Sequence, residues 1–385
     1  MTPDTILREK TKIIRPEGYQ YLNIIKNHLD GDLSRVFNGD CIYPRQMEIH
    51  LPANGKAPCN FNCFYCQGGQ VDRSLGKWEK QGLSIVEQLK GAVPYYIYGG
   101  AYTEPLMNKY LLDYLKLTKK YNNNFGIHTN GSLLVQLENS IKFCSSLIAL
   151  GESPKDYISI SLDAGSTRSH CLTKSVKKDW FSEIIEGLRI LTKLRGPRTF
   201  PSIRVCYLMN NYNSSPDEIA DIVNIMKNLK VDSLRFSVPY DQYGKPFDVV
   251  EQYRQNFEIP FGEACEKIVT PHLSESMSEK PYIFWHPPTF QDVKKMCFEQ
   301  CIYSYYQLTF GADGHVYRCS SSASPTFTQA ILGHVSDDFE DFKRMVVANH
   351  NPHWNASTCF KAGARCNRIA LEINEAWNNG AIQKD

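Results

Sequence analysis

Three cysteines lie close together near the start of the chain, at Cys59, Cys63 and Cys66, in the pattern C-x3-C-x2-C. A disulfide would use only two of these thiols. A zinc site would need a fourth ligand nearby, and the nearest histidine, His50, falls in the preceding predicted strand. A [4Fe–4S] cluster suits three thiolates, because they ligate three irons and leave the fourth open to another ligand. The pattern therefore favours a [4Fe–4S] cluster with an open iron, with zinc as the alternative.

A second group of cysteines lies toward the other end of the chain, at Cys297, Cys301, Cys319, Cys359 and Cys366. The chain has 13 cysteines in all, an odd number, and its charged N-terminal segment lacks the apolar core of an export signal. Outside an oxidising compartment, cysteines in this number indicate metal, cluster or redox chemistry, or inert buried thiols. We therefore expect a cytoplasmic protein whose cysteines are not paired in disulfides.

The first cysteine group follows one of six short β-rich segments that alternate with stretches of helical periodicity. The predicted strands cover residues 46–51, 95–98, 125–129, 157–162, 203–209 and 233–238, and the predicted helices cover 84–92, 106–121, 133–150, 180–195 and 216–229. Such alternation predicts parallel strands joined by right-handed crossovers. Periodicity alone leaves open whether they form a barrel or an open doubly wound sheet.

The character of the sequence changes after about residue 240, which suggests a division into four parts. Residues 1–45 are a charged N-terminal extension, 46–240 are the β/α domain, and 241–284 are a polar connecting segment. Residues 285–385 hold five cysteines and only short β-rich runs. A region with so little core needs a metal or cluster to be stable.

The order of motifs along the β/α region resembles that of the radical S-adenosylmethionine (SAM) superfamily. The cysteine triplet has the superfamily's spacing, with the aromatic Tyr65 before its last cysteine. The segment Gly99-Gly100-Ala101-Tyr102-Thr103-Glu104-Pro105 is similar to the GGEP motif, with an insertion before Glu104, and Thr129-Asn130-Gly131 matches the usual TNG. These motifs follow successive predicted strands, and the carboxyl ends of barrel strands are where α/β barrels carry their chemistry.

This resemblance implies a fold, a set of cofactors and a reaction. The fold would be α/β, a partial (β/α)6 TIM-like barrel spanning about residues 45–240. The open iron would chelate SAM, and reductive cleavage would give a 5′-deoxyadenosyl radical that abstracts a substrate hydrogen. A flavodoxin- or ferredoxin-type protein would donate the electron. The residues implied to bind the cofactor are Tyr65, Gly99, Gly100, Glu104, Asn130, Ser159, Ser161 and Asp163.

The C-terminal cysteines resemble part of a SPASM/Twitch auxiliary-cluster domain. Cys301-x12-Gly314-x4-Cys319 is similar to the hairpin that opens such domains, and Asp313-Gly314 is by itself a favourable hairpin turn. The shorter, one-cluster Twitch arrangement fits the number of cysteines. It implies one auxiliary [4Fe–4S] cluster held by Cys301, Cys319, Cys359 and Cys366, with Cys297 able to replace one of the last two. Zinc is the alternative metal.

Five cysteines remain outside the two groups, of which Cys144 and Cys206 are most simply core residues. Cys171 follows the fourth predicted strand near the expected barrel mouth, and it is our candidate for a catalytic thiol that returns a hydrogen atom to a substrate radical. Arg235, on the sixth strand, could hold a carboxylate of the substrate or of SAM.

The overall charge is close to neutral, with 43 Lys and Arg against 41 Asp and Glu. This balance disfavours nucleic acid as a partner, and no apolar run is long enough to span a membrane. We expect dehydrogenation or epimerisation of a small sugar or aminocyclitol-type molecule in natural-product biosynthesis. The alternative is maturation of a ribosomally made precursor peptide, for which the 45-residue extension is too short to be a winged peptide-binding domain. A non-enzymatic iron–sulfur protein does not explain an open iron.

Overall fold

The structure is a computed structural model, and it describes residues 32–37, 40, 42–53, 59–66, 82–100, 103–238, 259–286, 302–320, 323, 331–334 and 379. Ten strands form one sheet in the order β10-β9-β8-β1-β2-β3-β4-β5-β6-β7. The strands are β1 Gln46–Ile49, β2 Tyr95–Tyr98, β3 Asn124–Thr129, β4 Tyr157–Ser161, β5 Ser202–Leu208, β6 Ser233–Ser237, β7 Tyr282–Trp285, β8 Gln307–Phe310, β9 His315–Tyr317 and β10 Ile331–His334.

The sheet is parallel from β8 through β1 to β7, and only β9 and β10 are antiparallel. All six strands predicted from the sequence are present. The two further parallel strands, β7 and β8, add to the two sides of this array, and β7 crosses the expected boundary at residue 284. The division into domains stays a prediction.

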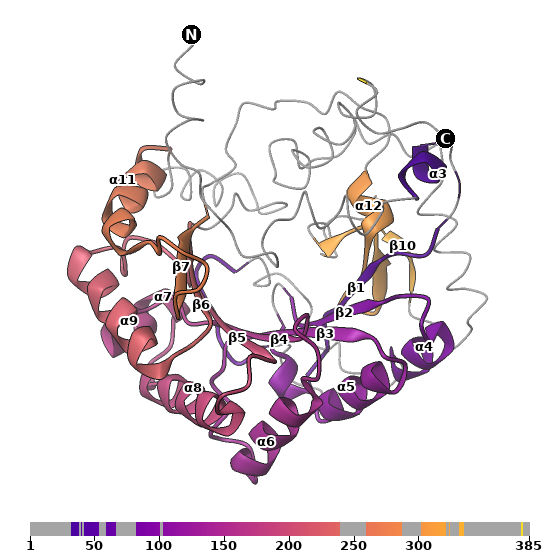
Figure 1. The fold of residues 1–385 in the computed structure, drawn as a ribbon, viewed down its shortest axis with the longest axis horizontal. Helices are drawn as coiled ribbons and strands as arrows, with labels where there is room; N and C mark the ends of the chain where they lie inside the picture. Colours follow the sequence, from indigo (N-terminus) through magenta and orange to yellow (C-terminus); the bar gives the residue numbers. More distant parts are fainter. Residues whose placement is uncertain are drawn as a thin grey trace.

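Helices connect the parallel strands along the outside of the sheet. They are α4 Gly82–Leu89, α5 Leu111–Lys120, α6 Ser140–Leu150, α7 Thr167–Lys174, α8 Phe181–Arg195, α9 Pro216–Leu229 and α11 Ile259–Val269, with short helices α3 Leu33–Phe37, η4 Pro105–Met107, η5 Thr270–His272 and α12 Ile302–Tyr306. Figure 1 shows α4, α5, α6, α8 and α9 along one face of a curved sheet. A doubly wound sheet would carry helices on both faces, so the curved, one-sided arrangement selects the partial barrel.

The predicted helix boundaries hold best where capping residues mark them. Helix α9 begins at Pro216, where the Ser215 side chain accepts a hydrogen bond from the Glu218 amide. The predicted helix over 133–150 is too long, because Asn139 adopts a left-handed conformation at φ 58° and α6 starts only after it. Helix α7 was not predicted, since it is mostly polar and lacks an apolar period. It starts at a capping box formed by Ser166 and Ser169.

The core lies between the outer face of the sheet and these helices. Alternate strand residues such as Ile158 and Ile160 are fully buried there, as are Leu188 and Ile222 on the covering helices. The opposite residues of the same strands face the inside of the barrel. No helix in the described part of the chain is long and apolar enough to cross a membrane.

The predicted hairpin near the C-terminal end of the described residues is present. Strands β8 and β9 pair antiparallel around a turn in which Gly314 has a φ of 82°, a conformation that favours glycine. The Gly311 amide donates a hydrogen bond to the His315 carbonyl across this turn. Cys319 lies two residues beyond the end of β9 and is half-buried.

Candidate active site at the open end of the barrel

The three cysteines of the first group line one cavity of about 340 Å³ inside the barrel. Their loop follows β1 and runs through residues 59–66, where the Cys66 amide donates a hydrogen bond to the Cys63 carbonyl. The cavity is reached by residues from the carboxyl ends of β2 to β5 as well. The loop and the strand ends therefore build a single site, at the place where parallel barrels carry their chemistry.

Two asparagines hold the cysteine loop against the end of β3. The Asn130 side chain donates hydrogen bonds to Asn60 Oδ1 at 2.9 Å and to Cys59 Sγ at 3.7 Å. Asn60 donates in turn to the Ser132 hydroxyl at 2.8 Å, and that hydroxyl donates to Asn130 Oδ1 at 2.7 Å. The TNG motif therefore fixes the position of the cysteine loop.

The three cysteines bring their thiols to one cavity, which suits the ligand set of an iron–sulfur cluster. Among the described residues, no three Cys, His, Asp or Glu side chains come close enough together to hold one ion. A zinc ion needs ligands gathered at about 2.0–2.3 Å around one point. In an iron–sulfur cluster each thiolate binds a different iron, so its cysteines surround a larger volume. Burial raises the pKa of the Cys63 thiol to about 11 and raises the pKa of the Cys59 thiol still more. Both thiols are therefore protonated at neutral pH, and iron would displace a proton from each sulfur when it binds.

The segment after β2 brings its glycines and Glu104 to the same cavity. Gly99 has a φ of 103°, and a side chain on Gly100 would overlap the His50 ring, so both positions need glycine. Glu104 is fully buried, and its carboxylate accepts hydrogen bonds from the Leu106 amide at 3.0 Å, the Asn130 amide at 2.6 Å and the Thr129 hydroxyl. Burial outweighs these bonds and raises the pKa of Glu104 to about 7.

A buried ion pair between Asp163, just after β4, and Lys174, at the end of α7, touches the cysteine loop. Lys174 Nζ lies 2.5 Å from Asp163 Oδ2 and donates a hydrogen bond to the Tyr65 hydroxyl at 2.8 Å. The Tyr65 hydroxyl donates to the same Asp163 oxygen. Burial lowers the pKa of Lys174, but Asp163 and then Cys63 outweigh this effect, so its pKa lies above the usual value. Lys174 was not singled out from the sequence, because a lysine on a polar helix has no distinguishing pattern.

Besides the three cysteines of the loop, Cys206 also lines the cavity. It lies on β5, is nearly fully buried, and its sulfur is 3.3 Å from the Ser159 hydroxyl. Cys171 is not among the residues that line the cavity. It lies on α7 and donates a hydrogen bond to the Lys178 carbonyl. The alternation of side chains along β5 could have indicated that Cys206 faces the cavity, since Arg204, Cys206 and Leu208 share one face of the strand.

The predicted site residues that line the cavity are Cys59, Cys63, Cys66, Tyr65, Gly100, Glu104, Asn130, Ser159, Ser161 and Asp163. Gly99 adjoins it in the chain. Thr103 also lines the cavity, and its buried hydroxyl has no hydrogen-bond partner among the described residues, so it is ready to bind a ligand. Of the second cysteine group, Cys297, Cys301, Cys359 and Cys366 lie outside the described residues.

The cavity continues below the strand ends into a set of polar residues that we call the lower tier. The lower tier comprises Glu48, His128, Tyr157, Arg204 and Arg235, which come from β1, β3, β4, β5 and β6. Except for Arg235, none of these residues stood out in the sequence. They face the cavity because alternate residues of each strand point inward.

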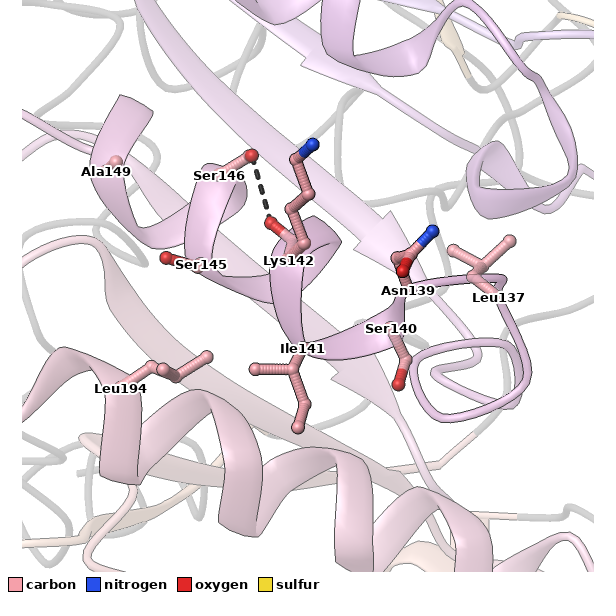
Figure 2. Close-up of a pocket in the computed structure, with 9 residues that line it drawn as sticks. All are labelled: Leu137, Asn139, Ser140, Ile141, Lys142, Ser145, Ser146, Ala149 and Leu194. Atoms are coloured by element: carbon pink, nitrogen blue, oxygen red, sulfur yellow. Dashed lines mark hydrogen bonds between the residues drawn. The ribbon is translucent and has the colours of Figure 1, made fainter.

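A second hollow lies on the outside of the barrel, between α6 and α8 (Figure 2). It is open to solvent, and its residues include the exposed Ile141 together with Lys142 and Leu194. Among its lining residues there is no thiol, carboxylate or imidazole. We therefore assign the chemistry to the cavity inside the barrel.

Comparison with known proteins defines the class to which this site belongs. Residues 58–224 match the model of the Radical SAM superfamily. This part of the chain, which contains the cysteine loop and strands β2 to β5, is a radical SAM domain. The superfamily implies a [4Fe–4S] cluster and SAM as cofactors.

Particular relatives match parts of the chain. A probable GTP 3′,8-cyclase of Pyrococcus abyssi is 26% identical over 168 residues, which cover 43% of this chain and 48% of that protein. A protein of the same name from Pyrococcus horikoshii is 28% identical over 142 residues, which cover 36% and 41%. The chain thus spans about half the length, or less, of these relatives.

Solved structures share the fold at low sequence identity. The enzyme anSMEcpe with bound AdoMet has a TM-score of 0.55 at 15% identity, over 88% of this chain and 93% of that one. Streptococcus suis SuiB bound to precursor peptide SuiA has a TM-score of 0.54 at 14% identity, over 85% and 73%. These likenesses confirm the predicted α/β, TIM-like barrel.

Proposed function

We propose that the protein is a radical SAM enzyme whose cluster is held by Cys59, Cys63 and Cys66. The observation that supports this most is the convergence of these thiols with Glu104 and Asn130 on one cavity. When bound, the cluster and SAM together supply the radical that abstracts hydrogen from a substrate. The substrate would occupy the rest of the cavity, toward the lower tier.

The residues around the cysteines have positioning roles in this proposal. Asn130 fixes the cysteine loop through Asn60, and Glu104 in turn fixes the Asn130 backbone. The Thr103 hydroxyl is available to bind a polar atom of SAM. The Lys174 ammonium, beside Tyr65 and Asp163, places a positive charge near the thiolates and offsets part of their negative charge.

For the reaction and the substrate we propose a class rather than a particular molecule. We favour oxidation or epimerisation of a small polar molecule, because the lower tier is lined by charged side chains. The two Pyrococcus relatives are named as probable GTP 3′,8-cyclases, and GTP is a small, polar molecule, which agrees with this choice. A sugar or aminocyclitol remains one candidate within the class. Modification of a peptide is the second proposal, because the SuiB structure with the same fold contains a precursor peptide.

We also propose an auxiliary [4Fe–4S] cluster near Cys319. The hairpin of β8 and β9 ends two residues before this half-buried thiol. Cys301, Cys359 and Cys366 would complete the site, with Cys297 as a substitute for one of the last two. A flavodoxin- or ferredoxin-type donor would reduce the first cluster.

The test is SAM cleavage by anaerobically reconstituted protein. With dithionite and SAM, the wild-type protein should form 5′-deoxyadenosine, and replacing Cys59, Cys63 and Cys66 together with Ala should abolish it. Cys144→Ala is the matched control, because this thiol is buried on α6 and does not line the cavity. If the triple variant retained 5′-deoxyadenosine formation, the proposed function would be wrong.

A further inference from the structure

Lys174, which lines the cavity, is attached to the cysteine loop at two points. Its ammonium group donates a hydrogen bond to the Tyr65 hydroxyl at 2.8 Å, and its backbone carbonyl accepts one from the Asn62 amide at 3.3 Å. Tyr65 directly precedes Cys66, and Asn62 directly precedes Cys63. The last residue of α7 therefore contacts the cysteine loop on both sides of Cys63.

The Lys174 ammonium is buried and held in one position. Its side chain is 2% exposed, and Asp163 Oδ2 lies 2.5 Å from Nζ. Asp163 is fixed in turn, because its other carboxylate oxygen accepts a hydrogen bond from the Leu208 amide at 2.6 Å. The Asn213 side chain also donates a hydrogen bond to the Asp163 carbonyl at 2.8 Å. A charge that is held in a buried site is weakly screened, so it acts strongly on its neighbours.

The two charges of this ion pair do not act equally on the Cys63 thiol. Burial raises the pKa of Cys63, and among the charges around this thiol Lys174 has the largest effect, which lowers the pKa. Asp163 raises the pKa by a smaller amount. The ion pair as a whole therefore stabilises negative charge on the Cys63 sulfur.

We propose that Lys174 raises the reduction potential of the cluster held by Cys59, Cys63 and Cys66. Reduction transfers one electron from the proposed flavodoxin- or ferredoxin-type donor to the cluster, and it forms and breaks no bond. The reduced cluster carries one more negative charge, so a fixed cation beside it stabilises the reduced state more than the oxidised state. This proposal rests on the proposed radical SAM function and adds a residue that controls the entry of the electron.

The experiment measures the potential of this cluster in anaerobically reconstituted protein without SAM, by redox titration followed by electron paramagnetic resonance. The signal of the cluster is identified as the one that disappears when Cys59, Cys63 and Cys66 are replaced with Ala. At the midpoint potential of the wild-type cluster, the ratio of reduced to oxidised cluster should fall about tenfold in Lys174→Met, which is a shift of about 59 mV for one electron. Lys174→Arg keeps the charge, so its potential should lie closer to that of wild type.

Lys119→Met is the matched control for the loss of a buried ion pair. Lys119 Nζ lies 2.7 Å from the fully buried carboxylate of Asp156, but Lys119 is on α5 and does not line the cavity. Both variants should lose stability, and only Lys174→Met should change the potential. The double variant Lys174→Met/Asp163→Asn provides a second test if Lys174→Met does not fold. Its potential should lie between those of Lys174→Met and wild type, because Lys174 outweighs Asp163.

Three results would overturn the proposal. These are an unchanged or raised potential in Lys174→Met, an equal fall in Lys119→Met, and a potential of the double variant at or above that of wild type. The failure of this proposal is distinguishable from that of the proposed function. A wild-type protein that cleaves SAM while its potential does not depend on Lys174 contradicts only this proposal, whereas a wild-type protein that binds no [4Fe–4S] cluster contradicts both.

Discussion

The buried ion pair of Lys174 and Asp163 leads to a quantitative prediction about stability. The side chain of Lys174 is 2% exposed and that of Asp163 is 0% exposed. Replacing Lys174 with Met removes the ion pair and the hydrogen bond to Tyr65, and leaves a buried carboxylate without its cation. Removing one partner of a buried pair costs about 3–5 kcal/mol, because the remaining charge is not compensated. Lys174→Met should therefore lower the free energy of unfolding by about that amount.

Two further variants separate this effect from a loss of side-chain volume. Lys116→Met removes an exposed lysine, 3.7 Å from Asp113, whose ion pair contributes less than about 1 kcal/mol. The double variant Lys174→Met/Asp163→Asn removes the stranded charge. Asp163 has a φ of 53°, and Asn tolerates this left-handed conformation, so the backbone should be preserved. The double variant should recover part of the stability lost in Lys174→Met.

The assay is guanidinium unfolding of anaerobically reconstituted protein, followed by intrinsic fluorescence. The midpoint should fall in the order wild type, double variant, Lys174→Met, with Lys116→Met close to wild type. The reasoning would be refuted if Lys174→Met cost no more than Lys116→Met. It would also be refuted if the double variant were less stable than Lys174→Met, because the loss would then not come from an uncompensated carboxylate.

Three further predictions follow from individual side chains. Wild-type protein should hold about eight irons, and Cys319→Ala about four; about four irons in both, with zinc in the wild type, would contradict the auxiliary cluster. Burial lowers the pKa of His170 in the folded protein to about 4. As the pH falls below about 6.5, His170 therefore gains a proton in the unfolded state before it does so in the folded state. The free energy of unfolding should thus decrease between about pH 6.5 and pH 4. His170 should account for a drop of about 2 kcal/mol between pH 8 and pH 5, which is absent in His170→Leu; an equal drop in both proteins would contradict this. If the reaction returns a hydrogen atom from a thiol, product formed in deuterated water should carry one deuterium, and Cys206→Ala, rather than Cys171→Ala, should abolish this incorporation.

Local patterns in the sequence were sufficient for the repeating part of the fold. The strands of the β/α region were found because continuous runs of β-branched and aromatic residues mark buried parallel strands. The start of α9 was found because Ser215 and Pro216 form a local capping signal. The helix over 133–150 was wrong at its start, because apolar periodicity does not reveal that Asn139 adopts a positive φ.

The cluster loop could also be read from the sequence, because its chemistry depends on residues a few positions apart. The spacing of Cys59, Cys63 and Cys66 is a local property, and so is the position of the TNG motif after a strand. Their convergence on one cavity agrees with the rule that parallel strands place their carboxyl ends at one edge. The Asn130 contact to Asn60 was not predictable, because it joins loops 70 residues apart.

Only the tertiary structure decided between a doubly wound sheet and a barrel. It also determined which residues line the inside of the barrel. Both folds have the same alternation of strands and helices, and only the curvature of the sheet distinguishes them. The sequence cannot show that β8 pairs with β1 from about 260 positions away, which brings Gln307 to Glu48. Arg204 and Arg235 are unremarkable in their own segments. They line one cavity because curvature turns alternate residues of neighbouring strands toward a common centre, which is a property of the assembled barrel and of no single segment.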